Sequence, residues 1–178
     1  MTDLIMADGY ATLIEPDTLR IQRVLPGPIE RVFAYLADGD LRRLWLAAGE
    51  MEKKVGAPFT LTWRNDELSD VPSKRPEGFG EEHSMESRVL ELDEPRKLAF
   101  SWGGQGKVTF ELEPKGEEVL LTLVHERLPA DRSTRLNICA GWHSHLDVLA
   151  ARVADRKAGP FWDNWSGLKQ EYDGRVPA

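Results

Sequence analysis

The chain has 178 residues, of which 23 are basic and 30 acidic, giving a formal net charge of −7, and 41% are hydrophobic. This length suits one domain whose core needs no disulfide or metal to stabilise it. The acidic balance argues against a nucleic-acid groove, which needs a basic stripe, and against binding to an anionic membrane surface. We therefore expect no nucleic acid and no membrane among its partners.

The cysteine content and the composition of the N-terminal segment indicate the cellular compartment of the protein. The single cysteine, Cys139, excludes an intramolecular disulfide and suits a reducing environment. No apolar run approaches the ~18 residues that a membrane-spanning helix needs. Residues 1–17 carry four acidic and no basic side chains, the reverse of a signal or transit peptide. These features predict a cytoplasmic protein.

The first elements along the chain are predicted to be one strand and two short helices. Residues 18–25 (TLRIQRVL) are rich in branched side chains and partly alternate in hydrophobicity, which predicts a strand. The Pro-Gly-Pro turn at residues 26–28 ends it, because proline lacks the backbone donor of a strand ladder. An amphipathic helix follows over residues 28–38, with apolar side chains at i, i+3, i+4 and i+7 from Ile29. A second short helix is expected over residues 41–45.

The hydrophobic period then changes to two, between residues 50 and 127, which predicts strands. Residues 58–64 alternate, with Phe59, Leu61 and Trp63 on one face. Further strands are expected over residues 84–92, 97–102, 108–112 and 119–127. Short connections that contain glycine or proline separate most of them, as in an antiparallel meander.

Toward the C-terminus the period returns to 3.6 and predicts one long helix. It starts at Asp131 or Ser133, both good N-caps, and runs to about Lys157, before the helix-stopping Gly-Pro pair at residues 159–160. At ~1.5 Å per residue it is roughly 40 Å long, enough to cross a sheet. Its inner stripe contains Arg135, Ile138, Cys139, Trp142, Leu146, Leu149 and Val153. Ser144 is expected outside this stripe.

These elements are expected to form one domain over residues 1–178. Its core spans residues 18–157, and residues 1–17 form an N-terminal extension. Residues 158–178 are too aromatic for a free tail and are expected to pack on the core. Residues 65–82 form a long polar loop, and loops of this length are usually functional or disordered.

The order of elements predicts an α+β fold. A curved antiparallel sheet wraps around the long C-terminal helix, and two short helices follow the first strand. Because a strongly curved sheet cannot close on one helix everywhere, we expect a cavity between its concave face and the helix. Inward-pointing strand residues would line that cavity.

Four stretches of the chain resemble the START-like superfamily, also called SRPBCC, within the group similar to the activator of the heat-shock-protein-90 ATPase. They are IQRVLPGPIERVFAYLADGDLRRLW, VGAPFTLTW, VLELDEPRKLAFSW and GWHSHLDVLAARV, in this order. The resemblance covers one domain, from about Thr18 to Val153. It implies a helix-grip fold with a hydrophobic pocket and, in most members, no catalytic signature.

Aromatic and aliphatic side chains on the inward faces are the candidate ligand contacts. Six tryptophans in one small chain suit a small-molecule cavity, where aromatic walls surround a few polar groups. The alternative is that they fill a solid core. The predicted ligand-pocket residues are Trp45, Phe59, Leu61, Trp63, Phe100, Trp102, Phe110, His125, Trp142, His145, Leu146 and Leu149.

Two of these candidates, His125 and His145, bring polar chemistry to the expected cavity. A pair of histidines in an apolar cavity can bind a carbonyl or a phenol, or serve as acid and base. The alternative is that both make ordinary hydrogen bonds to backbone or water. His143 and His145 lie two residues apart and therefore point roughly 200° from one another on a helix, so they cannot share a metal ion.

No other pattern points to catalysis or to a cofactor. The Gly-Gly-Gln-Gly run at residues 103–106 lies between strands rather than before a helix, so it is no phosphate cradle. A Gly-x-Ser-x-Gly nucleophile motif is missing. Cys139 lies on the inner helical stripe and is interpreted as a small buried residue. We therefore predict no metal, no cofactor and no committed catalytic residue.

Three functions remain open from the sequence. The leading hypothesis is a monomeric or homodimeric protein that binds a small hydrophobic or aromatic molecule. The second is a co-chaperone-like stress-response protein that acts on a heat-shock ATPase through its surface. The third is an enzyme of the cyclase or dehydratase kind, which the superfamily also contains.

Overall fold

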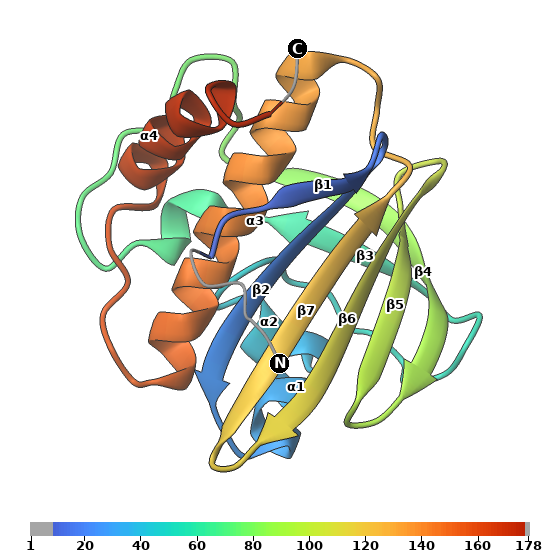
Figure 1. Cartoon of the computed structure of the whole chain (residues 1–178). Helices are drawn as coiled ribbons and strands as arrows, with labels where there is room; N and C mark the ends of the chain where they lie inside the picture. Colours follow the sequence, from blue (N-terminus) through green and yellow to red (C-terminus); the bar gives the residue numbers. More distant parts are fainter. Residues whose placement is uncertain (1–8, 177–178) are drawn as a thin grey trace.

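The structure is a computed structural model that describes residues 9–176 (Figure 1). Its seven strands are β1 (Thr12–Glu15), β2 (Thr18–Pro26), β3 (Pro58–Trp63), β4 (His83–Asp93), β5 (Lys97–Trp102), β6 (Gly106–Lys115) and β7 (Glu118–Glu126). Its helices are α1 (Ile29–Ala37), α2 (Gly39–Arg42), α3 (Arg132–Val153) and α4 (Phe161–Asp173), with a 3₁₀ turn, η1 (Asn65–Leu68).

The strands form one curved antiparallel sheet in the order β1-β2-β7-β6-β5-β4-β3. Helix α3 lies across the inner side of this sheet, and α4 packs on the side of α3 that faces away from the strands (Figure 1). Helices α1 and α2 lie toward the end of the sheet where β2 gives way to α1. The prediction of an α+β helix-grip fold is confirmed.

The structure differs from the sequence prediction at the start of the chain. Residues Thr12–Glu15, expected to belong to an extension, form the edge strand β1, which pairs with β2. Three of its four residues are exposed, so it lacks the alternation by which the other strands are recognised. Residues 1–8 lie outside the described part of the chain.

The long helix α3 begins as expected but ends earlier. The Asp131 carboxylate accepts a hydrogen bond from the backbone N–H of Thr134 (2.9 Å) and so caps the N-terminus. At the other end Asp155 adopts a left-handed conformation (φ 55°), and the N–H of Arg156 donates to the carbonyl of Ala151 (2.8 Å). This arrangement is a Schellman motif, which stops the helix at Val153 rather than near residue 157.

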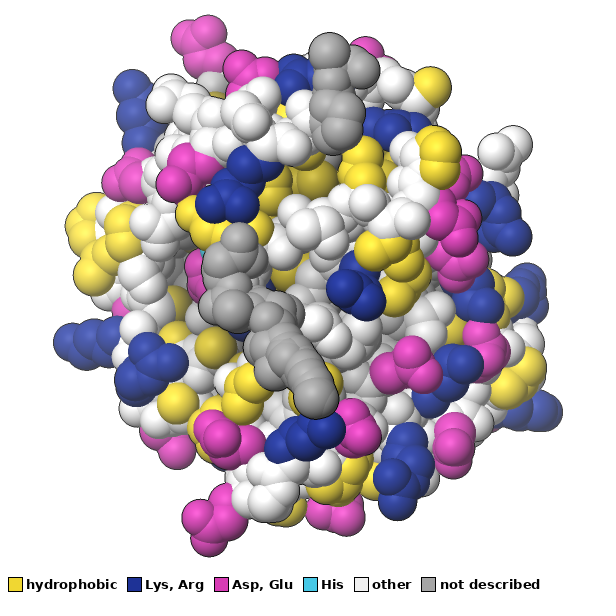
Figure 2. Space-filling view, in the orientation of Figure 1, with side chains coloured by type: hydrophobic (Ala, Val, Ile, Leu, Met, Phe, Trp, Pro, Cys, Tyr) yellow, Lys and Arg dark blue, Asp and Glu magenta, His cyan; other side chains and the backbone are white. Residues whose placement is uncertain are grey.

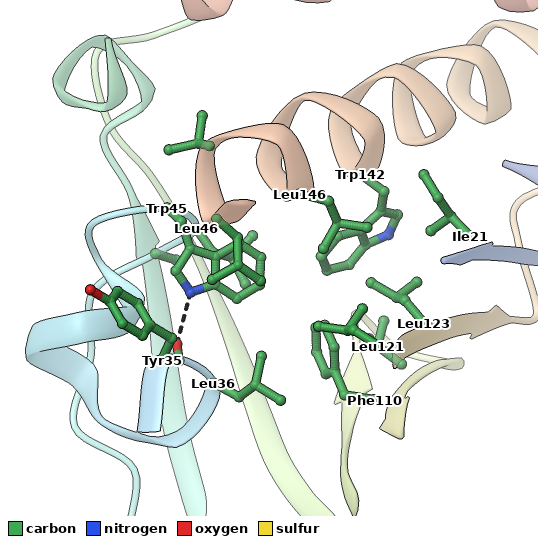
Figure 3. Close-up of a cluster of buried hydrophobic side chains, with 14 of the residues drawn as sticks. Ile21, Tyr35, Leu36, Trp45, Leu46, Phe110, Leu121, Leu123, Trp142 and Leu146 are labelled. Atoms are coloured by element: carbon green, nitrogen blue, oxygen red, sulfur yellow. Dashed lines mark hydrogen bonds between the residues drawn. The ribbon is translucent and has the colours of Figure 1, made fainter. Parts of the chain in front are cut away.

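Helix α3 is buried on two faces. Trp142 and Leu146 point toward Phe110, Leu121 and Leu123 of the sheet (Figure 3). The opposite face is covered as well, because Ser144, expected outside the inner stripe, is only 3% exposed and lines a small hollow beside α4.

A polar contact ties the outer face of α3 to α4. The Tyr172 hydroxyl of α4 accepts a hydrogen bond from the backbone N–H of Ala11 (2.7 Å). Its own proton is therefore available to His143 Nδ1, which lies 2.8 Å away on α3. Helix α4 thus fixes both α3 and the segment that leads into β1.

The space between α3 and the middle of the sheet is filled by aromatic and aliphatic side chains (Figure 3). The ring of Phe110 lies edge-on to Trp45, at 6.1 Å between centroids, and to Trp142, at 6.0 Å. The Trp45 indole N–H donates to the backbone carbonyl of Tyr35 (2.7 Å), so its polar edge is satisfied within the core. This part of the interior is therefore a solid core.

The described surface carries charges of both signs. Acidic and basic side chains are interspersed on the described part of the face in Figure 2. Glu91 of β4, for example, pairs with Lys97 of β5 (2.9 Å) and with Lys107 of β6 (2.6 Å). Among residues 9–176, no helix is both long and apolar enough to cross a membrane.

One buried cation, Arg42, joins α1, α2 and the segment before β3. Its side chain is 1% exposed and donates to the backbone carbonyls of Leu36 (3.2 Å), Ala37 (3.3 Å) and Gly49. The guanidinium also lies over the Phe59 ring, 5.6 Å from its centroid. Burial lowers the pKa of Arg42 to about 10, so it stays charged at neutral pH.

Replacing this cation tests its structural role. Arg42→Met keeps much of the side-chain volume but leaves three carbonyls without their donor, so we expect a loss of about 2–4 kcal/mol in the free energy of unfolding. Urea denaturation measures this loss. The exposed neighbour Arg43→Met is the matched control and should change stability by less than about 0.5 kcal/mol. Equal effects of the two variants would contradict the assignment.

Candidate functional site

A pocket of about 460 Å³ opens where one end of the sheet meets α3 and α4. It lies between the end of β3, the start of β4, the end of β5, the middle of α3, the start of α4 and the loop before β4. Seven aromatic side chains line it: Trp63, Phe79, His83, Trp102, His145, Phe161 and Trp162. The predicted opening between sheet and helix is thus confined to one end.

The aromatic lining forms two groups of rings. On the sheet side, Trp63 lies edge-on to Trp102, with 5.4 Å between ring centroids, and 5.7 Å from His83. On the helix side, Trp162 contacts Phe161 (5.2 Å) and Phe79 (5.3 Å). Flat aromatic walls of this kind suit a small, largely apolar molecule.

A glycine in the middle of α3 leaves the pocket open. Gly141 lines the pocket, and a Cβ added there would meet no atom within 4 Å. Glycine inside a helix costs about 1 kcal/mol relative to alanine, so its presence here is a local disadvantage. The space that it preserves belongs to the pocket.

The long loop over residues 65–82 is attached to the start of α4 by hydroxyl groups. The Ser69 hydroxyl accepts from the backbone N–H of Phe161 (2.7 Å), and the Ser73 hydroxyl accepts from that of Trp162 (2.7 Å). Pro160, the residue before α4, has no side-chain acceptor of its own. The loop therefore caps this helix and holds two pocket-lining rings in place.

Carboxylates of the same loop add further contacts. Asp66 accepts from the indole N–H of Trp162 (2.7 Å). Asp70 accepts from Arg152 at the end of α3 (2.7 Å) and from the backbone N–H of Ala158 (2.6 Å). These donors hold the pKa of Asp70 below its usual value, first through the Ala158 N–H and then through Arg152. The loop and α4 together form one wall of the pocket.

His145 of α3 brings a polar atom into the pocket. Its Nδ1 lies 2.8 Å from the backbone carbonyl of Trp45, and because a carbonyl only accepts, Nδ1 carries the proton. Burial lowers the pKa of His145 to about 4, so the ring is neutral at neutral pH. Its Nε2 is then a hydrogen-bond acceptor, and no hydrogen bond occupies it among the described residues.

His125 of β7 has the opposite arrangement and lies in the core. Its Nδ1 is 3.0 Å from the indole nitrogen of Trp142, which can only donate, so Nδ1 accepts and the proton resides on Nε2. The ring packs against Trp102, 5.4 Å between centroids, and is 1% exposed. Burial lowers the pKa of His125 to about 4 as well. It stabilises the position of two tryptophans.

The structure separates the predicted pocket residues into two groups. Trp63, Trp102 and His145 line the pocket. The other nine are buried side chains that do not line it: Trp45, Phe59, Leu61, Phe100, Phe110, His125, Trp142, Leu146 and Leu149. They form the solid core next to the pocket.

Most of the other lining residues are not predicted from the sequence. Phe161 and Trp162 lie in the aromatic C-terminal segment, whose composition already indicated packing but not a pocket. Gly141 interrupts an otherwise good helix pattern, and this was the signal that could have identified it. Phe79 and His83 lie in and after a loop that carries no periodicity.

A larger surface groove of about 740 Å³ lies beside α1 and α2. Charged side chains such as Asp40, Arg43 and Lys53 are prominent in its lining, and it lies outside the junction of sheet and α3. Its polar character does not suit an apolar ligand.

The described residues do not assemble a metal centre or a reactive thiol. Among them, no three His, Cys, Asp or Glu side chains gather in a position to hold a metal ion. His143 faces Tyr172, whereas His145 faces the carbonyl of Trp45. Burial raises the pKa of Cys139 to about 11, so this thiol stays protonated at neutral pH.

The two buried histidines predict a pH dependence of stability. Their pKa values are lowered in the folded state, so the unfolded chain binds more protons between about pH 4 and 6.5. Stability is therefore lost as the pH falls through this window, by roughly 2 kcal/mol per histidine at about pH 4.5. Urea denaturation at about pH 6.5 and 4.5 measures the loss.

Two variants test whether the buried histidines cause this loss of stability at low pH. His125→Asn keeps an acceptor for the Trp142 indole but does not titrate in this range, so it should roughly halve the loss. His83→Asn, at an exposed position, should leave the loss unchanged. If both variants reduce this loss of stability equally, or if neither reduces it, the buried histidines are not its cause.

Comparisons with known proteins agree with this architecture. The family model described as "Activator of Hsp90 ATPase homolog 1-like protein" matches residues 26–154. The protein encoded by gene BPP1335 of Bordetella parapertussis, solved by NMR, is 38% identical over 96% of this chain and 92% of its own, with a TM-score of 0.78. A search of the curated proteins found no match.

A more distant solved structure supports the fold alone. CalU16 from Micromonospora echinospora is 18% identical, with coverage of 90% of this chain and 89% of its own and a TM-score of 0.66. The family model covers the core of the fold, from the end of β2 to the end of α3. The chain therefore belongs to the activator-of-Hsp90-ATPase-like family of SRPBCC domains.

Proposed function

We propose that the protein binds a small apolar or aromatic molecule in the pocket between the sheet end, α3 and α4. The observation that carries this proposal is the set of seven aromatic side chains that line the pocket together with Gly141. Burial of apolar surface supplies the affinity at ~25 cal/mol per Å², so a two-ring ligand that buries about 250 Å² gains roughly 6 kcal/mol before the cost of association is subtracted.

The polar groups of the pocket favour binding over proton transfer. His145 is the pocket residue with a titratable imidazole fixed by a backbone contact, and its lowered pKa of about 4 makes it a weak base at neutral pH. A fixed, neutral imidazole orients a ligand without reacting with it. The proposal therefore includes no catalytic residue.

Filling the pocket tests the proposal. Gly141→Leu places a side chain in the pocket without a clash at Cβ, so we expect it to weaken binding of N-phenyl-1-naphthylamine at least about ten-fold. Binding is measured by the fluorescence of the probe and by quenching of tryptophan. Melting temperature confirms that the variant folds, since leucine is a better helix former than glycine.

The matched control is Gly167→Leu in α4. This glycine also lies inside a helix, and a Cβ there also meets no atom within 4 Å, but it does not line the pocket. It should bind the probe as the wild type does. If the wild type does not bind, or if both leucine variants bind equally well, the proposal is wrong.

A further inference from the structure

One acceptor of the pocket lining has no donor among the described residues. It is His145 Nε2, because the Trp45 carbonyl fixes the proton on Nδ1. A ligand that fills the pocket displaces water from this acceptor, and an acceptor left without a partner is costly, so a ligand that donates a hydrogen bond avoids this cost.

Donors are present on the sheet side of the same pocket. Among the described residues, no hydrogen bond occupies the indole N–H of Trp63 or of Trp102. A hydroxyl group both donates and accepts, so it matches a pocket that contains an acceptor and indole donors. A ketone or an ether only accepts, and it would leave His145 Nε2 unpaired.

Charge at the pocket disfavours anions. Glu81 and Glu82 belong to its lining, whereas the lining residues, all within the described part of the chain, include no lysine or arginine. Glu82 pairs with Arg64 (2.9 Å), which neutralises one of the two carboxylates. An aromatic carboxylate would enter this pocket beside Glu81 without a cation to pair with.

We infer that the pocket selects neutral hydroxylated aromatic molecules, that is phenols, over aromatic ethers, ketones and carboxylates of the same size. This inference rests on the proposed function and names the class of ligand. His145 is the residue that determines the preference, and the tryptophans supply affinity without selecting among flat rings.

A set of naphthalenes of equal size tests the inference. We expect the wild type to bind 2-naphthol about ten-fold more tightly than 2-methoxynaphthalene, which corresponds to about 1.4 kcal/mol, and to bind 2-naphthoate most weakly. Asparagine at position 145 retains an amide donor for the Trp45 carbonyl but has no acceptor at the place of Nε2. His145→Asn should therefore reduce the ten-fold preference to less than about three-fold.

Two further variants make the result decisive. His145→Leu removes the same acceptor with an apolar side chain and should also reduce the preference, which keeps the test open if His145→Asn does not fold. His125→Asn changes a buried histidine outside the pocket and should leave the preference unchanged.

The outcomes separate the two proposals. If 2-methoxynaphthalene binds the wild type as tightly as 2-naphthol, and Gly141→Leu weakens both, the selectivity inference fails and the binding function stands. If His145→Asn and His145→Leu both keep the full preference, His145 does not determine it and the inference fails. If no naphthalene binds, both proposals fail.

Discussion

Burial of α3 on two faces is the constraint on which the rest of the structure depends. A helix that crosses a curved sheet buries one face against the strands, here through Trp142, Leu146 and Leu149. The other face of α3 carries His143 and Ser144, which are also buried. A second layer is therefore needed, and α4 supplies it. Once α4 lies there, its N-terminus needs acceptors, and the loop of residues 65–82 provides them through serine hydroxyls. The fixed loop is thus a consequence of how the long helix is covered.

The same arrangement closes the core at one end of the sheet and leaves a pocket at the other end. At one end, α1 and α2 close the core, with Arg42 joined to three backbone carbonyls and the Trp45 indole to a fourth. At the other end, Trp63, His83 and Trp102 lie where β3 ends, β4 begins and β5 ends. There the loop and the start of α4 face the sheet across open space instead of filling it, and Gly141 contributes no side chain. The hollow therefore lies beside the core and not within it.

The sequence predicts best the strands and helices that have one buried and one exposed face. Residues 58–64 are predicted as a strand within one residue of its observed limits, because β3 alternates between exposed and buried side chains over most of its length. The alternation of apolar side chains identifies which face of a strand is buried. It does not show which residues on that face pack in the core and which line a pocket. Phe59 and Trp63 share one face of β3, yet the first packs in the core and the second lines the pocket. The same is true of Phe100 and Trp102 on β5. Distinguishing them requires the long-range pairing of strands and the position of α4, and neither is encoded in a local pattern.

The two buried histidines show why residue type alone does not define the chemistry of the pocket. His125 and His145 are equally neutral and similarly buried, but their partners impose opposite tautomers. An indole N–H makes the Nδ1 of His125 an acceptor, whereas the carbonyl of Trp45 makes that of His145 a donor. The acceptor that His145 presents to the pocket is therefore set by a main-chain group of the core residue Trp45. Because the Trp45 indole is itself bonded to Tyr35 on α1, the packing of the closed end of the fold determines which hydrogen bond the open end offers.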